Sequence, residues 1–405
     1  MGFIGDLLIF ILSLSVLVVI HELGHLLTAK LFKVYCREFS IGMGPLIFKL
    51  KKANWETQFS IRAIPLGGFV SMVGEDAGDN DMAGGQLDPS KKDEKDLTEE
   101  DRIIMSLPKE RRLDGIKRWQ RAIVMAAGVT MNVILAFFLF LGQGATSQTY
   151  DNSFKSLNVY DQTGLMASNG YISGSDFVSG KVTYTITVDG KQETYEVKDD
   201  NIENQDDLYK LFSIPMELLP SSENDYITYE YTCINPETNK TYDVSFVRNA
   251  EKNDNYIDYT GYFYKGSMGV SFMMRDRTFM EVVSFAGKST VEGAELIFEG
   301  LGMIFTQGLE AVGGPIAMFE VSSLAVDMGI SYFFYLWGII SINLAVMNFL
   351  PIPGLDGWHF LVLIFEGITK KEMPSNAKNI ASTIGLILLF GLMIIVTIKD
   401  IIGLF

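Results

Sequence analysis

Long, nearly uncharged runs of apolar residues alternate with polar segments along this 405-residue chain. A transmembrane helix needs about 20 such residues to cross the hydrocarbon core of a bilayer. Four runs are long enough, and they cover residues 5–29, 122–141, 328–355 and 379–398. The pattern therefore predicts an α-helical polytopic membrane protein with about four transmembrane helices.

Basic residues flank these runs unevenly, and lysine and arginine accumulate on the cytoplasmic side of membrane proteins. Clusters follow the first run, precede the second, and separate the third from the fourth: Lys30, Lys33 and Arg37; Arg111, Arg112, Lys117, Arg118 and Arg121; Lys370, Lys371 and Lys378. If the spans alternate in direction, all three clusters share one side, which is predicted to be cytoplasmic. Both termini and residues 143–275 are then extracytoplasmic.

The polar segments differ in character. Residues 34–75 are aromatic-rich with glycine punctuation and predict a β-hairpin or small sheet on the cytoplasmic side. Residues 74–102 are acidic and predict a disordered linker. Residues 150–265 contain three strand-like runs and one helix-like run, which predict a small α+β domain. Residues 276–326 predict one or two amphipathic helices leading into a Gly-Gly-Pro break at residues 313–315.

Together these segments predict three parts. Residues 1–145 form an N-terminal membrane half, residues 146–270 an extracytoplasmic domain, and residues 271–405 a C-terminal membrane half. The C-terminal half holds the amphipathic helices and the last two spans.

Composition supports a membrane protein and excludes some other classes. The chain is 48% hydrophobic, its net charge is −16, and its mean hydropathy is +0.20. No basic face of the kind that binds nucleic acid is evident. The two cysteines, Cys36 and Cys233, are far apart and are predicted to lie on opposite sides of the membrane. A disulfide framework or a thiolate zinc site is therefore not expected.

The second half of the first apolar run contains the sequence HELGH, from His21 to His25. On a helix, histidines at positions i and i+4 share a face and can chelate one Zn²⁺, and the adjacent Glu22 can act as a general base. An ionisable group inside a membrane span is costly and is a functional candidate by default. The motif therefore predicts a zinc protease that works within or at the edge of a membrane.

A catalytic zinc site needs a third protein ligand, and two residues near the end of the third run are candidates. Asp356 is the better one, because Pro351 and Pro353 break the helix before it and it lies on the same predicted side as HELGH. His359 is the other. Each also has a purely structural interpretation: Asp356 as an interfacial helix-end carboxylate, and His359 as a packing residue one turn further on.

Three motifs in this order resemble the bacterial site-2 protease family, which comprises intramembrane zinc metalloproteases of peptidase family M50. They are HELGH in the first run, FSIGMGP after it, and NLAVMNFLPIPGLDG near the C-terminus. The most similar group has an extracytoplasmic PDZ insertion and is typified by the regulator-of-sigma-E protease. The resemblance covers nearly the whole chain except the acidic linker.

The resemblance implies a bacterial plasma-membrane enzyme that cleaves transmembrane segments of single-pass membrane proteins, such as anti-sigma factors or remnant signal peptides. It implies that His21, His25 and Asp356 bind zinc, with Glu22 as the general base. It also implies that residues 36–75 form a membrane-associated β-loop, which can hold an extended substrate by strand addition. Three asparagines match family positions that support the substrate or the oxyanion: Asn343, Asn348 and Asn132. For Asn343 and Asn348 the alternative is a hydrogen bond between membrane helices.

The chain departs from the family pattern at a few positions. Trp358 follows Gly357 where the family has a second glycine, and Val129 replaces a proline three residues before Asn132. The extracytoplasmic domain resembles a PDZ domain only in its second half, so its role is either to bind peptide termini or to exclude bulky ectodomains. The alternatives to a membrane protease are a soluble zinc protease and a catalytically inactive, membrane-anchored PDZ-like binding or scaffold protein.

Overall fold

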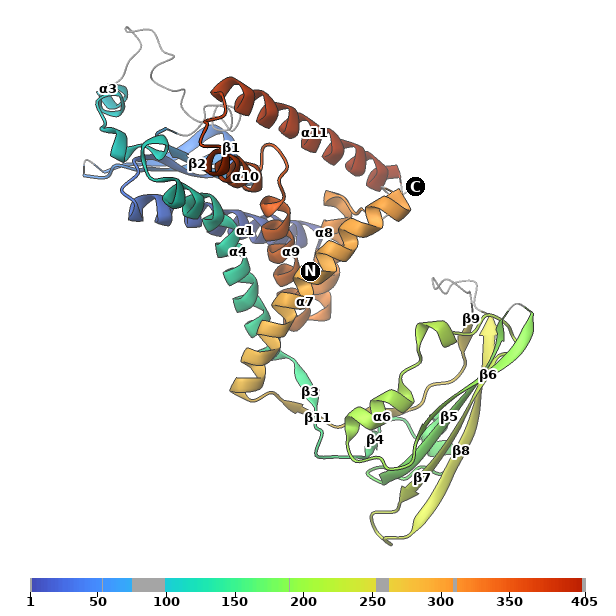
Figure 1. Cartoon of the computed structure of the whole chain (residues 1–405). Helices are drawn as coiled ribbons and strands as arrows, with labels where there is room; N and C mark the ends of the chain where they lie inside the picture. The colour runs from blue at the N-terminus through green and yellow to red at the C-terminus, as the bar shows by residue number, and fades with distance from the viewer. Residues whose placement is uncertain are drawn as a thin grey trace. The chain divides into compact units, whose positions relative to one another are not determined.

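The computed structural model describes residues 2–52, 54–74, 99–188, 190–252, 262–308 and 312–402. The chain divides into two compact units, which we describe separately (Figure 1). The membrane unit comprises Met1–Ser147 and Thr278–Phe405, and the inserted unit comprises Gln148–Arg277.

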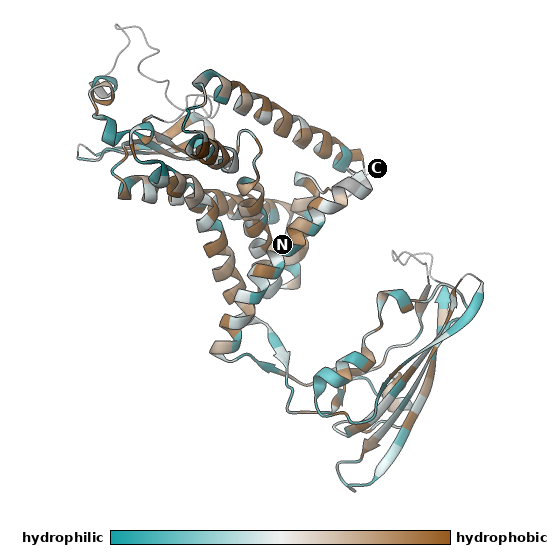
Figure 2. Ribbon diagram, in the orientation of Figure 1, coloured by the Kyte–Doolittle hydropathy of each residue, from teal (hydrophilic) through white to brown (hydrophobic). Residues whose placement is uncertain are grey.

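Within the described residues, four helices of the membrane unit are long and apolar enough to cross a bilayer. They are α1 (Phe3–Leu31), α4 (Arg118–Thr146), α9 (Ile330–Phe349) and α11 (Ser375–Ile402). The shortest, α9, has 20 residues, and at a rise of about 1.5 Å per residue it spans about 30 Å. The prediction of four long apolar helices is thereby confirmed. Apolar residues dominate these helices (Figure 2), and large ones such as Leu8 and Leu12 are exposed where lipid would cover them.

The third span is shorter than the uncharged run predicted. The run extends to residue 355, but α9 ends at Phe349 and a new helix, α10 (Asp356–Thr369), begins at Asp356. Pro351 and Pro353 explain the difference, because proline has no N–H to donate and its ring clashes with the preceding helical turn. Because the chain breaks between α9 and α10, the carboxylate of Asp356 lies at the start of a new helix, next to a membrane-spanning helix.

Helix α4 lies at the centre of the membrane unit and packs against α1, α7 (Phe279–Gln307), α9 and α10. Glycines allow the close approaches: Gly144 faces Phe285 of α7, and Gly338 of α9 faces the ring of Phe140. Small residues at such contacts let helix backbones approach closely, which increases the van der Waals attraction that holds membrane helices together.

The predicted amphipathic segment forms α7 and α8 (Pro315–Met328). Gly313 and Gly314 lie between them, and Pro315 is the first residue of α8, where a missing N–H costs nothing. The C-terminal part of α11 bonds to the residues around this break. Asp400 accepts a hydrogen bond from the N–H of Ala317, and Lys399 donates one to the carbonyl of Val312. The C-terminal end of α11 is therefore tied to the start of α8.

Residues 34–75 form the predicted small sheet, built from β1 (Cys36–Leu50) and β2 (Gln58–Met72). Both strands bend, so residues 36–41 pair with residues 68–72 on one side, and residues 38–41 pair with residues 58–61 on the other. Residues 68–72 are consequently one edge of the sheet. Figure 1 shows this sheet beside the C-terminal end of α1, against which it packs through Phe39, Val70 and Met72.

Charged side chains tie the sheet to the neighbouring segments. Glu56 pairs with Lys30 at the end of α1 and with Arg111 before α4, at 2.9 and 2.7 Å. Partial burial opposes ionisation of Glu56, but the hydrogen bonds from Lys30 and Arg111 outweigh it and lower the pKa of Glu56 below its usual value. Two segments that are distant in sequence therefore meet at one loop of the sheet.

The predicted acidic linker lies mostly outside the described residues, but its last part is ordered, contrary to the prediction. Residues 99–102 begin α3 (Glu99–Met105). Asp101, fully buried, pairs with Arg37 of β1 at 2.8 Å, and Ile104 is also buried. The ion pair links this short helix to the sheet, which the acidic composition alone did not indicate.

The inserted unit is built on a five-stranded antiparallel sheet in the order β6-β5-β7-β8-β9. The strands are β5 (Asp176–Val188), β6 (Lys191–Asp199), β7 (Tyr226–Ile234), β8 (Thr241–Lys252) and β9 (Tyr262–Tyr264). The three predicted strand-like runs lie in β5, β7 and β8, and the helix-like run forms α6 (Gln205–Phe212). Alternating buried residues such as Val182, Tyr184 and Ile186 of β5 form its core.

Two short strand pairs join the beginning of the inserted segment to its end. The pairs are β3 (Gln148–Tyr150) with β11 (Met274–Asp276), and β4 (Leu157–Val159) with β10 (Val270–Phe272). Both are antiparallel, so the chain enters and leaves the unit side by side. This arrangement lets a domain be inserted between α4 and α7.

Candidate metal centre

His21 and His25 lie one turn apart on α1 and are both buried, each about 6% exposed. Their spacing puts the imidazoles on the same helix face. The Nε2 atoms of the two rings are 3.3 Å apart. The helix alone therefore brings two nitrogen ligands together.

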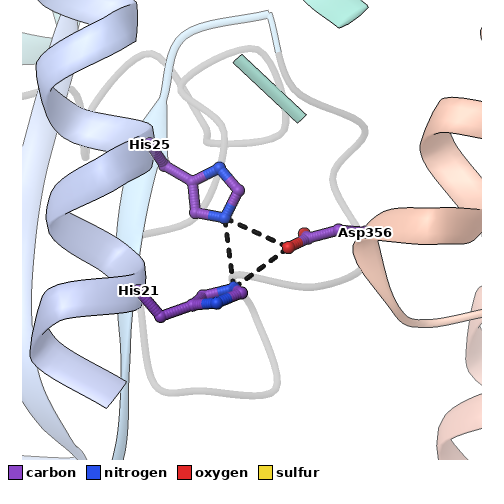
Figure 3. A group of neighbouring side chains, drawn as sticks. All are labelled: His21, His25 and Asp356. Carbon is purple, nitrogen blue, oxygen red and sulfur yellow. Dashed lines mark hydrogen bonds and ion pairs between the residues drawn. The ribbon is translucent and has the colours of Figure 1, made fainter. Parts of the chain in front are cut away.

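Asp356 reaches the histidines from the first residue of α10 (Figure 3). Gly354 has a φ of +95°, a conformation that favours glycine, and an added Cβ would meet the Leu386 side chain at 2.9 Å. Asp356 Oδ2 lies 3.0 Å from His21 Nε2 and 3.2 Å from His25 Nε2. The proline break and the glycine turn thus place a carboxylate oxygen against two imidazoles from a segment more than 300 residues away.

These three atoms fit a zinc ion. At zinc–ligand distances of about 2.0–2.1 Å, ligands of a tetrahedral site lie about 3.3 Å apart, and here the three separations are 3.0, 3.2 and 3.3 Å. His25 Nδ1 donates to the carbonyl of Val124 at 2.8 Å, which leaves a lone pair on Nε2 of the neutral ring. Lone pairs and a carboxylate that converge in this way are stabilised by a cation. Within the described residues, His21, His25 and Asp356 are the group of this kind that could hold a metal.

Helix α4 forms the wall behind the imidazoles, and it approaches through Gly128. An added Cβ at Gly128 would collide with the Nε2 atoms of both His21 and His25. On the facing helix, a Cβ at Gly24 would lie 2.5 Å from the carbonyl oxygen of Ala127. The two glycines therefore set how closely the α4 backbone can lie against the face of α1 that carries His21 and His25.

Gly128→Ala is expected to weaken zinc binding, because the new methyl group must displace the imidazoles or push the helices apart. Overpacking of this kind costs about 1–3 kcal/mol, which corresponds to roughly 5- to 150-fold in affinity. Competition with a zinc chelator measures the effect on the purified chain. Gly287→Ala is the matched control, because a Cβ there meets nothing within 4 Å. Equal zinc affinity of Gly128→Ala and the wild type would contradict this account of α4.

Glu22 lies beside the metal group and is half-buried. It lines a cavity of about 190 Å³ together with Val18, His21, Leu344, Asn348, Gly354, Leu355 and Asp356. The backbone N–H of Val70, on the edge of the small sheet, hydrogen-bonds to the Glu22 carboxylate. A carboxylate fixed in this way at the wall of a cavity beside a metal group can accept a proton from a molecule held in that cavity.

The remaining candidates from the sequence take different places. Asn348 lines the cavity with Glu22, whereas Asn343, half-buried on α9, is not among its lining residues. Asn132 is fully buried in α4, and its side chain contacts His21 Nδ1 at 3.2 Å. His359 lines a separate cavity of about 30 Å³ with Arg121 and Lys378. The structure thus brings Asp356, and not His359, to the two histidines.

Sequence reasoning missed three residues that shape this centre: Val70, Gly128 and Ser341. Ser341, fully buried in α9, donates a hydrogen bond to the backbone carbonyl of Asn132 at 2.8 Å. Gly128 offered a signal, because a glycine inside an apolar helix often marks a close approach. Val70 acts through its backbone N–H, so the type of its side chain could not indicate this role in the sequence.

Comparisons with known proteins agree with this geometry. The model of peptidase family M50 matches residues 9–392. A putative zinc metalloprotease of Clostridium acetobutylicum is 30% identical over 98% of this chain and 97% of its own length. A putative zinc metalloprotease of Clostridium perfringens is 28% identical over 97% of each chain. The regulator of sigma-W protease RasP of Bacillus subtilis is 26% identical over the full length of both.

Proposed function

The chain belongs to peptidase family M50, and from this premise we propose that it cuts peptide bonds within the transmembrane segments of single-pass membrane proteins. It is an intramembrane zinc metalloprotease, and the observation that carries this function is the convergence of His21, His25 and Asp356 between membrane helices. We propose that these three residues hold the zinc ion.

We assign each residue of the centre one task. When bound, zinc supplies a Lewis acid that polarises a carbonyl and lowers the pKa of a water toward neutrality. Glu22 is the general base, because it lines the same cavity as Asp356 and its carboxylate is oriented by Val70. Asn348, which also lines that cavity, supports the substrate or the developing oxyanion, and Asn343, five residues earlier on α9, supports it indirectly.

A helical substrate hides its scissile carbonyls in hydrogen bonds between residues i and i−4, so it must unwind before cleavage. We propose that the substrate then adds as a strand to the edge of the small sheet at residues 68–72. Val70 on this edge already contacts Glu22. A strand docked there lies next to the general base.

We propose that the active site faces the cytoplasm and that both termini and the inserted unit are extracytoplasmic, because three basic clusters fall on one side of the spans. The inserted unit is then a PDZ-like domain between the two membrane halves, which filters substrates by the size of their ectodomains or by their termini. By analogy with the B. subtilis relative, a regulator of sigma-W, we propose that the substrate is an anti-sigma factor or another short membrane-spanning remnant.

Cleavage-site mapping tests this function. The purified chain is reconstituted in liposomes with a single-span substrate whose ectodomain has been trimmed, and the products are identified by mass spectrometry. We expect one or more cuts inside the apolar segment, because the metal group lies between membrane helices. Cuts confined to the soluble flanks of the substrate would contradict the proposal. Binding without any cut would instead favour the inactive scaffold protein.

A further inference from the structure

Asn132 is a buried amide directly behind the metal group. Its side chain is fully buried in α4, with Nδ2 3.2 Å from His21 Nδ1, while Oδ1 has no hydrogen-bond partner within the described part of the chain. Asn132 is not among the residues that line the cavity with Glu22. Its contact is therefore with the outer nitrogen of a metal-binding imidazole and not with the space where a substrate would react.

Helix α4 holds the outer nitrogens of both imidazoles. His25 Nδ1 faces the carbonyl of Val124, and His21 Nδ1 faces the side chain of Asn132. A backbone carbonyl can only accept, so the proton of neutral His25 sits on Nδ1 and Nε2 remains free for a metal. Metal-binding histidines generally donate their second N–H in this way, which fixes the ring and its tautomer.

For His21 the tautomer depends on which amide atom faces Nδ1. With Nδ2 in that place, Nδ1 must accept, the ring proton moves to Nε2, and Nε2 cannot bind a metal. A half turn of the planar amide leaves its shape unchanged and puts Oδ1 there instead. Oδ1 can then accept a hydrogen bond from Nδ1–H, the same role that the Val124 carbonyl has for His25. Only this orientation is compatible with zinc bound to His21.

The position of Asn132 is fixed from its other side. Ser341 of α9 donates a hydrogen bond to the Asn132 carbonyl at 2.8 Å, and both residues are fully buried. This contact fixes the α4 backbone at Asn132. The side chain of Asn132 is not used in it and contacts His21.

We propose that Asn132 is a positioning residue for zinc binding: its amide oxygen accepts a hydrogen bond from the Nδ1–H of His21, which keeps the proton on Nδ1 and leaves Nε2 available for the metal. This role differs from the substrate or oxyanion support expected from the sequence. It rests on the proposed function only in taking His21 as a zinc ligand.

Zinc affinity of the full-length chain in detergent, measured by chelator competition, tests the role without reference to catalysis. Asn132→Leu keeps a similar size but cannot accept a hydrogen bond, and we expect about 10- to 100-fold weaker zinc binding, as is typical when such a partner is lost. Asn132→Asp retains an acceptor and is expected to bind zinc at least as tightly as the wild type. Thr130→Val is the matched control, since Thr130 is exposed on the same helix and bonds only to its own turn.

His21→Ala separates this inference from the proposed function. If His21→Ala keeps the zinc affinity of the wild type, the ligand assignment itself fails. If His21→Ala loses zinc but Asn132→Leu binds it normally, only the positioning role fails. A loss of cleavage by Asn132→Leu with normal zinc affinity would likewise overturn the inference and point to substrate support. Should the leucine variant not fold, Asn132→Ala is measured with the same expected loss and the same contrary outcome.

Discussion

Replacing Glu22 with glutamine is expected to lower the rate of peptide cleavage by about 10²- to 10⁴-fold, the usual contribution of a general base. Glutamine has nearly the same size as glutamate and can still accept the hydrogen bond from Val70, but it cannot take up a proton. Zinc binding should remain close to that of the wild type, because Glu22 is not part of the His21–His25–Asp356 group. Single-turnover cleavage in liposomes and zinc content per chain measure the two effects.

A carboxylate-to-amide change elsewhere in the membrane unit provides the control. Glu320 is exposed on α8, and Glu320→Gln is expected to cleave at the wild-type rate. Equal cleavage by Glu22→Gln and the wild type would rule out Glu22 as the base. Loss of zinc from Glu22→Gln would show that the change had damaged the metal centre instead of the proton transfer.

Replacing Asp356 with asparagine is expected to remove zinc as well as activity. Asp356 supplies the anionic oxygen that lies 3.0 and 3.2 Å from the two imidazole nitrogens. A neutral amide of the same shape has neither the charge nor the ligand strength of a carboxylate. We expect zinc affinity to fall by at least about 100-fold, the upper end of what loss of an outer partner costs, and cleavage to fall below detection at limiting zinc.

The contrast between the two variants is the informative result. Asp114→Asn, an exposed acid outside the centre, is the control and should retain both zinc and activity. If Asp356→Asn binds zinc as the wild type does, the third ligand is another residue. If Glu22→Gln and Asp356→Asn lose zinc equally, the separate roles of base and ligand are refuted.

The membrane helices could be predicted from the sequence because their signal is local. A run of about 20 residues without charges is a helix in a bilayer whatever it packs against, since its backbone must satisfy its own hydrogen bonds. The end of α9 at Phe349 is local too, because Pro351 and Pro353 encode it. The order of α3 was not predictable from its acidic composition, because it depends on the buried pair of Asp101 with Arg37.

The grouping of His21, His25 and Asp356 was predictable, but most of the contacts that support it were not. Spacing on one helix fixes His21 and His25, and the proline break directs attention to Asp356. The contacts of Gly128, Asn132 and Val70 depend on which helix and strand lie against α1. The apolar residues of α1 occur on all of its faces. No amphipathic pattern in its sequence therefore marks the face that packs against α4. Helix pairing of this kind follows from three-dimensional packing, which periodicity does not record.

Zinc K-edge X-ray absorption of the purified wild-type chain tests the central claim most directly, because it reports the atoms around the metal without any variant. If His21, His25 and Asp356 hold the zinc, the spectrum contains two imidazole nitrogens and carboxylate oxygen at about 2.0–2.1 Å. A sulfur neighbour at about 2.3 Å, or fewer than two imidazoles, would contradict the account.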